Sequence, residues 1–205
     1  MNSRPTPSFI YLASQSPRRR QLLAQIGVRY EMLLPDADED AEALEAERAG
    51  ELPADYVERV TRAKLGAARQ RLQRSGRPPA AILCADTTVA LGRKLLGKPV
   101  DAAQACATLR LLSDRTHRVI SAVAVADGGR EWFAASVSSV RFACLPEAAI
   151  DAYVAGGEPF GKAGAYAIQG TMAAWIARIE GSYTGIMGLP LFETAQLLRQ
   201  AGVIR

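Results

Sequence analysis

Two sets of charged residues in this sequence are suited to chemistry on a phosphate chain. The cations are Arg18, Arg19, Lys64, Lys98 and Lys162, and the carboxylates are Asp38, Glu39 and Asp86. Binding a polyphosphate needs cations and N–H donors, whereas cleaving it needs a carboxylate that holds a metal or directs water. The sequence supplies both sets. It has no Gly-x-x-x-x-Gly-Lys-Ser/Thr motif, which argues against a P-loop ATPase.

Three arginines stand at the start of the first predicted helix, where carboxylates are normally preferred. An apolar run ending at Ala13 predicts a buried strand, Ser16 predicts the N-cap of the helix, and Gly27 predicts its end. Cations at positions 18–20 oppose the helix dipole and cost ~0.3 to 1 kcal/mol each, unless an anion binds the free N–H groups. The stretch therefore indicates an anion site, and an ordinary surface helix with a basic start is the alternative.

Helical geometry separates these arginines. Arg18 and Arg19 each lie one turn before a leucine that must face the sheet, so both are expected to point toward the protein body. Arg20 is expected to be solvated. Lys162, in a glycine-rich segment far along the chain, is expected to contact either phosphate or solvent.

Asp86 is the carboxylate that the sequence singles out. The apolar run 80–85 predicts a buried strand that ends at Asp86-Thr87-Thr88. Ligands commonly bind where a buried strand ends at the edge of an α/β sheet. A structural role for Asp86, as a cap or turn acceptor for Thr88, is the alternative.

The remaining hydrophobic pattern predicts helices and strands in mixed order. Strands are expected at 30–34, 80–85, 116–126, 132–142 and 175–179, and helices at 17–26, 53–75, 102–112, 146–154 and 191–201. Because they do not alternate strictly, we expect an α/β fold with a central mixed sheet flanked by helices and a cleft between two lobes. Residues 9–205 are expected to form one domain after a tail of residues 1–8.

Composition excludes several classes of protein. The chain of 205 residues is 49% hydrophobic, which is typical of a globular protein. Its net charge of +4 suits a phosphorylated substrate but is too small to indicate a stable nucleic-acid partner. No apolar run approaches the length of a membrane span, and residues 1–8 do not resemble a signal peptide, so a cytoplasmic protein is expected.

The cysteines do not suggest a disulfide framework or a zinc site. Cys84, Cys106 and Cys144 are odd in number, widely spaced and surrounded by apolar residues. We expect them to be reduced thiols in the core.

Seven motifs occur in a characteristic order along the chain. They are Ser14-x-Ser16-Pro17-Arg18-Arg19, Pro35-x-x-Asp38-Glu39, Lys64, Ala85-Asp86-Thr87, Gly97-Lys98-Pro99, Ala163-Gly164-Ala165-Tyr166-x-Ile168-Gln169-Gly170 and Gly188-Leu189-Pro190-Leu191-x-Glu193-Thr194. Each motif alone is weak, but their order and spacing together are specific. From about Ile10 to Gly202 the chain resembles the Maf nucleotide pyrophosphatases.

This resemblance implies an activity and assigns roles by position. The activity is hydrolysis of a nucleoside triphosphate to the monophosphate and pyrophosphate, with a divalent cation, Mg²⁺ or Mn²⁺. Asp86 corresponds to the general base or water activator, and Glu39 to a carboxylate that holds the metal together with Asp86. The positions that bind the triphosphate are Ser14, Arg19, Lys64 and Lys98. The resemblance also implies a homodimer.

Three further positions distinguish the branches of that family. Here they are Arg18, Thr87 and Gln169, which resemble the dTTP/UTP branch, whereas the branch of 7-methyl-GTP pyrophosphatases would show Trp, Gln and Glu. The carboxamide of Gln169 offers one acceptor and paired donors, which match the N3–H and O4 edge of uracil or thymine. The wrong base would leave polar groups unpaired.

Two other functions are alternatives. A non-catalytic regulator, linked to cell division, could bind nucleotides or nucleic acid in the same cleft, but carboxylates weaken phosphate binding unless a metal intervenes. An enzyme of the inosine triphosphate pyrophosphatase type would share the two-lobed architecture, but its base pocket would not predict Gln169. His117, the only histidine, has no visible orienting partner and is not expected to be catalytic.

Overall fold

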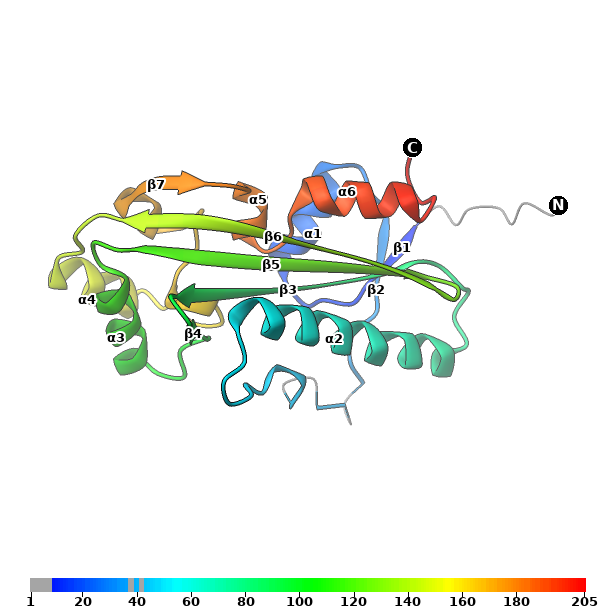
Figure 1. Cartoon of the computed structure of the whole chain (residues 1–205), viewed down its shortest axis with the longest axis horizontal. Coiled ribbons are helices and arrows are strands. Elements are labelled where there is room, and N and C mark those ends of the chain that lie inside the picture. Colours follow the sequence, from blue (N-terminus) through cyan, green and yellow to red (C-terminus); the bar gives the residue numbers. More distant parts are fainter. Residues whose placement is uncertain (1–8, 37–38, 41–42) are drawn as a thin grey trace.

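The centre of the molecule is a seven-stranded sheet (Figure 1), in a computed structural model that describes residues 9–36, 39–40 and 43–205. The strands are β1 (Ile10–Leu12), β2 (Tyr30–Met32), β3 (Ile82–Leu91), β4 (Lys94–Leu96), β5 (Thr116–Asp127), β6 (Arg130–Phe142) and β7 (Ile176–Glu180). Their order is β2-β1-β3-β5-β6-β7, with β4 paired to β3. β1 runs parallel to β2 and β3, whereas the pairings of β3 with β4 and β5, and of β6 with β5 and β7, are antiparallel. The predicted mixed sheet is confirmed.

Helices flank this sheet. They are α1 (Pro17–Gln25), α2 (Pro53–Ser75), α3 (Ala102–Leu112), α4 (Glu147–Ala155), α5 (Tyr183–Met187) and α6 (Leu191–Gln200), with short 3-10 turns η1 (Ala43–Glu45), η2 (Ala163–Ala165) and η3 (Thr171–Trp175). α2 packs on β3 and β5, and α6 packs on β5 and β6. Figure 1 shows α2 and α6 on opposite sides of the long strands, with α3 and α4 together at one end. The α/β class is confirmed.

The pattern of α2 explains how it presents a lysine to the sheet. Val57, Val60, Leu65 and Ala68 recur at helical spacing and are fully buried. Lys64 is adjacent to Leu65, at the margin of this buried face. Its long side chain can therefore run along the apolar surface and carry its ammonium toward β3.

The prediction that a buried strand ends at Asp86 is wrong. β3 continues through Leu91, and Asp86 pairs with Ala122 of β5 in an unbroken antiparallel register. The polar residues after Ala85 stay in the strand because β5 supplies backbone partners for all of them. Asp86 is thus neither a cap nor a turn residue but a side chain in the middle of a central strand.

The other edge of β3 explains why a carboxylate is accessible there. β1 pairs with β3 only as far as Leu83, and β4 pairs only with residues 89–91. Between these two pairings no strand of the described residues covers the edge of β3. A ligand site commonly forms at such a gap in the strand order of an α/β sheet.

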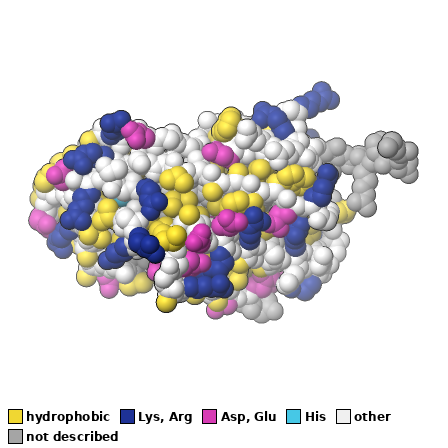
Figure 2. Space-filling view, in the orientation of Figure 1, with side chains coloured by type: hydrophobic (Ala, Val, Ile, Leu, Met, Phe, Trp, Pro, Cys, Tyr) yellow, Lys and Arg dark blue, Asp and Glu magenta, His cyan; other side chains and the backbone are white. Residues whose placement is uncertain are grey.

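Charges of both signs are mixed on the face shown in Figure 2. Along α2, Arg62 pairs with Glu58 and Glu131, and Arg69 also pairs with Glu131. This face therefore offers no continuous basic surface of the kind that binds a nucleic-acid backbone. Of the helices that the structure describes, none has both the length and the apolar character needed to cross a bilayer.

The cysteines are free thiols, as expected, but they do not all lie in the core. Cys84 is fully buried, and burial raises the pKa of its thiol to about 12. Cys106 is partly buried, and Cys144 is exposed. The apolar residues around Cys144 did not determine its burial because it lies in the connection between β6 and α4.

Candidate active site

A cavity of about 1070 Å³ opens at the uncovered edge of β3. Its walls come from the loop before α1, from α2, from β3 and from the segment around η2. The predicted site residues within the described part of the chain all line it, namely Ser14, Arg18, Arg19, Glu39, Lys64, Asp86, Thr87, Lys98, Lys162 and Gln169. Asp38 lies outside the described residues. Side chains up to 155 positions apart in the sequence therefore meet in one cavity.

The two inward-pointing arginines of α1 bind backbone oxygens at the end of α5. Arg18 Nε donates to the carbonyl of Met187 at 3.1 Å, and Arg19 Nε donates to that of Gly188 at 2.8 Å. Free carbonyls at a helix C-terminus attract cations, so α5 offsets the unfavourable position of these arginines on α1. Arg20 is exposed, as expected.

Burial affects both of these guanidinium groups. Desolvation lowers the pKa of Arg18 and of Arg19, and the charge of Asp86 acts in the opposite direction on Arg19. Arg19 Nη1 also donates to Ser14 Oγ at 3.0 Å. Ser14 and Arg19 are thus held together at the wall of the cavity, where an anion would improve the electrostatics of two partly desolvated cations.

Lys64 joins α2 to the central strand. Its Nζ donates to Asp86 Oδ1 at 2.6 Å, and only 10% of the Asp86 side chain is exposed. Because successive residues of a strand face opposite sides, Asp86 faces α2 while Thr87 faces α5. Thr87 Oγ1 lies 2.7 Å from Ser121 Oγ, and Ser121 donates to the carbonyl of Gly185 in α5.

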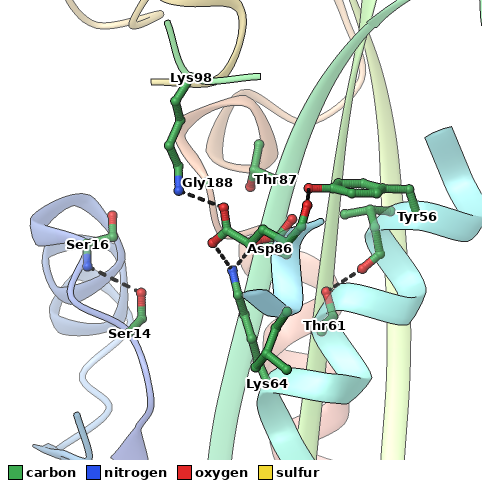
Figure 3. Close-up of polar contacts among 12 residues, drawn as sticks. Ser14, Ser16, Tyr56, Thr61, Lys64, Asp86, Thr87, Lys98 and Gly188 are labelled. Atoms are coloured by element: carbon green, nitrogen blue, oxygen red, sulfur yellow. Dashed lines mark hydrogen bonds and ion pairs between the residues drawn. The ribbon is translucent and has the colours of Figure 1, made fainter. Parts of the chain in front are cut away.

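Glu45 is a residue of this site that the sequence did not reveal. Its Oε1 accepts from Lys64 Nζ at 2.7 Å, and its Oε2 accepts from Lys98 Nζ at 2.8 Å. Figure 3 shows Lys64 and Lys98 reaching the same region beside Asp86 from two sides. Glu45 lies in an alanine-rich acidic stretch with no motif, so only the fold indicates its position.

Glu39 lines the cavity but is bound to arginines of α2. Its two oxygens accept hydrogen bonds from Arg71 and Arg74, the latter at 2.7 Å. Hydrogen bonding to Arg71 is the main cause that holds the pKa of Glu39 below its usual value. Asp86 lines the same cavity but is held by Lys64, so different cations neutralise the two predicted metal carboxylates.

The glycine-rich segment supplies the far wall. Gln169 is exposed at the cavity surface, and Lys162 is partly buried. Burial, and then the charge of Arg18, lowers the pKa of Lys162. Lys162 therefore belongs to the cationic wall rather than to open solvent.

Gly164 fixes how this segment approaches β3. Its φ of +70° favours glycine, and a Cβ there would lie 2.9 Å from the side chain of Val89. Its N–H donates to the carbonyl of Gly97 at 3.2 Å, and Gly97 directly precedes Lys98. The close approach of the backbone thus connects the wall that carries Gln169 to the wall that carries Lys98.

His117 is a buried residue that packs against aromatic side chains. Its Nε2 lies 2.7 Å from the hydroxyl of Tyr166 in a buried aromatic cluster, and it is not among the residues that line the cavity. Burial lowers the pKa of His117 to about 4. At neutral pH the ring is uncharged.

The donor set for a metal ion is small. In the parts of the chain that the structure describes, no group of three or more His, Cys, Asp or Glu side chains is placed to hold a metal. The two predicted metal carboxylates, Asp86 and Glu39, both line the cavity. Hard oxygen ligands of this kind suit Mg²⁺ or Mn²⁺, ions that are often bound by one or two carboxylates together with substrate phosphates.

Comparison with known proteins gives matches over nearly the whole chain. The sequence model of a family described as "Maf-like protein" matches residues 9–201. A dTTP/UTP pyrophosphatase of Polaromonas sp. (strain JS666 / ATCC BAA-500) is 61% identical over 199 residues, which cover 97% of this chain and 98% of that protein. The dTTP/UTP pyrophosphatase of Albidiferax ferrireducens is 61% identical over 194 residues, or 95% and 97% of the two chains. That of Burkholderia pseudomallei (strain K96243) is 60% identical over 201 residues, or 97% and 96%.

Proposed function

The chain belongs to the Maf family, and from this membership we propose that it hydrolyses dTTP and UTP to the nucleoside monophosphate and pyrophosphate. One structural observation carries the proposal. A buried carboxylate, Asp86, is presented by a central strand to a large cavity with a strongly cationic wall. Cations suit the triphosphate, and the carboxylate suits the activation of water beside it.

The proposed reaction is an in-line attack of water on the α-phosphorus. Asp86 orients the water and accepts its proton, the new P–O bond forms at the α-phosphorus, and the bond from that phosphorus to the bridging oxygen breaks. Pyrophosphate leaves with the electron pair of that bond. Lys64 fixes the orientation of Asp86 through the 2.6 Å hydrogen bond.

The triphosphate is assigned to one side of the cavity. Ser14, Arg19, Lys64 and Lys98 supply hydroxyl, guanidinium and ammonium donors for its oxygens. Arg19 is held by Ser14 and Gly188 before any ligand arrives, so little side-chain entropy is lost when it binds phosphate. Preorganised donors of this kind stabilise charge that develops on the leaving group.

Recognition of the nucleobase is assigned to Gln169, Thr87 and Arg18. The carboxamide of Gln169 matches the N3–H and O4 edge that thymine and uracil share. Thr87 and Arg18 shape the wall through their contacts with Ser121 and Met187. This division of roles predicts that dTTP and UTP are both substrates.

A divalent cation, Mg²⁺ or Mn²⁺, is part of the proposal. When bound, it neutralises negative charge on the phosphates. Asp86 and Glu39 are the carboxylates to which we assign it. Glu39 already accepts three hydrogen bonds from Arg71 and Arg74, so the contribution of Asp86 is expected to be the larger.

We further propose a cytoplasmic homodimer that binds neither nucleic acid nor a membrane. The resemblance to the Maf family supports the dimer, and the mixed charges on α2 support the absence of a nucleic-acid partner. Light scattering after gel filtration measures the mass directly, and a mass of one chain of 22.0 kDa would contradict the dimer.

Product analysis tests the function. Purified protein with Mg²⁺ or Mn²⁺ is incubated with dTTP, UTP, CTP, dATP, GTP, ITP and 7-methyl-GTP, and monophosphate and pyrophosphate are measured separately. Monophosphate and pyrophosphate from dTTP and UTP alone are expected. Hydrolysis centred on ITP would favour the inosine triphosphate pyrophosphatase type, and binding without turnover would favour the regulator.

A further inference from the structure

Glu45 stands between the two lysines that are assigned to the triphosphate. Its carboxylate accepts from Lys64 at 2.7 Å and from Lys98 at 2.8 Å, so each carboxylate oxygen has one ammonium. A phosphate group presents oxygens of the same charge to the same donors. The Glu45 carboxylate therefore occupies the position that a bound phosphate group would take between Lys64 and Lys98, with charge of the same sign.

Side chains of α2 build this position. Tyr56 Oη donates to the backbone carbonyl of Glu45 at 2.9 Å. Arg59 donates to the carbonyls of Leu44 and Ala46, on either side of Glu45. Arg59 is itself held by Glu51 through hydrogen bonds of 2.6 and 2.7 Å. The turn that carries Glu45 is thus fixed from helix α2, and the contact with the lysines is a consequence of the fold.

The ion pairs are partly shielded from water. About a quarter of the Glu45 side chain and a fifth of the Lys64 side chain are exposed. Burial acts to raise the pKa of Glu45, but Lys64 and Lys98 outweigh it, and the pKa lies below its usual value. Glu45 is consequently ionised at neutral pH and repels any phosphate placed beside it.

Few donors of Lys64 are free for a ligand. An ammonium has three N–H donors, and Lys64 already gives one to Asp86 and one to Glu45, which leaves one. A phosphate that binds both Lys64 and Lys98 in the geometry of these contacts must replace the carboxylate. We propose that Glu45 is a resident anion of the phosphate subsite, which pyrophosphate or a nucleotide triphosphate displaces from Lys64 and Lys98.

This proposal deepens the proposed function and rests on it for the identity of the natural ligand. Its consequence is that Glu45 determines affinity. A ligand that binds both lysines must first break the two ion pairs of Glu45, which lowers its affinity, and removal of the carboxylate eliminates this cost. A ligand without phosphate does not break these ion pairs.

The test is the affinity of the metal-free protein for inorganic pyrophosphate, measured by calorimetry in the presence of a chelator. We expect Glu45→Gln to bind pyrophosphate about three- to tenfold more tightly than the unaltered protein, the range expected when two partly exposed ion pairs are lost. Glu45→Ala, which cannot accept from the lysines at all, should show the same direction. The control Glu47→Gln makes the same change of net charge at an exposed neighbouring position and should leave the affinity unchanged.

Unchanged or weaker binding of pyrophosphate to both Glu45 variants would overturn the proposal, because it would show that the carboxylate either stays in place or organises the lysines for the ligand. A similar gain in the Glu47 variant would also overturn it, since the effect would then be one of net charge. Binding of pyrophosphate needs no turnover. A failure of dTTP hydrolysis and a failure of this proposal are therefore observed separately.

Discussion

At the scale of the residue, the proposed reaction depends on the pairing of Asp86 with Lys64. Asp86 is buried on a central strand, where an isolated carboxylate would be costly. Lys64 compensates it at 2.6 Å, and the same ammonium is assigned to phosphate. In the proposed reaction, Lys64 therefore contacts both the base Asp86 and the substrate, and so sets the distance between them.

Replacement of Asp86 by Asn tests the role of the carboxylate. The amide keeps the shape of the side chain but cannot accept a proton from water. We expect the turnover number on dTTP to fall by at least about 100-fold, within the range typical of a lost general base. Binding of dTTP, measured by calorimetry, should persist. An Asn variant with near-normal turnover would remove Asp86 from the reaction.

Replacement of Gln169 by Glu tests whether this residue recognises the nucleobase. The carboxylate cannot donate to O4 of thymine or uracil, so kcat/KM for dTTP and for UTP should fall by about tenfold, as expected for one lost hydrogen bond. Gln196→Glu on α6 is the matched control, because Gln196 is exposed and lies outside the cavity. Equal activity of the Gln169 variant and this control would exclude Gln169 from base recognition.

At the scale of the element, much of the site follows from sequence periodicity. The one-turn relation of Arg18 and Arg19 to buried leucines predicted that both point inward, and both bind carbonyls at the end of α5. The local sequence pattern does not predict the end of a strand that depends on pairing with a distant strand. The continuation of β3 past Asp86 requires β5, in which the partner of Thr87 is Ser121, 34 positions along the chain.

Glu45 and Glu39 illustrate the same limit for side chains. The sequence around Glu45 contains no motif that indicates a site. Glu45 reaches the cavity because Tyr56 and Arg59 of α2 hold the backbone around it. The resemblance assigned Glu39 to a metal, whereas the structure pairs it with Arg71 and Arg74, whose positions depend on the length of α2. The α/β class and the mixed sheet were predictable because they depend on many residues at once.

The segment between α4 and η3 gives a prediction for an element. Glu158 accepts hydrogen bonds from Tyr153 and from the backbone and hydroxyl of Thr171. A Cβ on Gly170 would overlap the carboxylate of Glu158, so Gly170→Ala must displace that side chain. We expect Gly170→Ala to lower kcat/KM several-fold by releasing the wall that carries Gln169.

A double-mutant cycle checks this reading. Glu158→Ala should lower kcat/KM to a similar extent, and the double variant should be no worse than either single one, since both changes remove the same contacts. Gly129→Ala in the β5–β6 hairpin is the control, because a Cβ there meets no atom within 4 Å. Additive losses in the double variant would show that Gly170 acts independently of Glu158.

At the scale of the whole molecule, the long strands form a frame on which two different clusters are placed. The cationic cavity opens at one edge of β3, and His117 lies outside it, buried against Tyr166, whose side chain contributes to the cavity wall. The first cluster is assigned to function, and the second contributes to stability. The contribution of His117 to stability can be measured separately, by following unfolding at several pH values.

His117 makes the stability of the fold depend on pH. Burial lowers its folded-state pKa to about 4, from about 6.5 in the unfolded chain, so the unfolded state takes up a proton first as the pH falls. The free energy of unfolding should therefore decrease between about pH 6.5 and pH 4, by roughly 3 kcal/mol in total. Urea unfolding at several pH values measures this slope.

The control for that slope is His117→Asn, which lacks a group that titrates in this range. Its free energy of unfolding should be lower at pH 7 but should change less between pH 6.5 and pH 4.5. A variant with the same slope as the unaltered protein would assign the pH dependence to other groups.

The most direct test of the proposed reaction is hydrolysis of dTTP in water enriched in ¹⁸O, followed by mass spectrometry of both products. Attack of water on the α-phosphorus beside Asp86 places the label in the monophosphate and leaves the pyrophosphate unlabelled. Label in the pyrophosphate, or formation of the diphosphate and inorganic phosphate, would contradict the account.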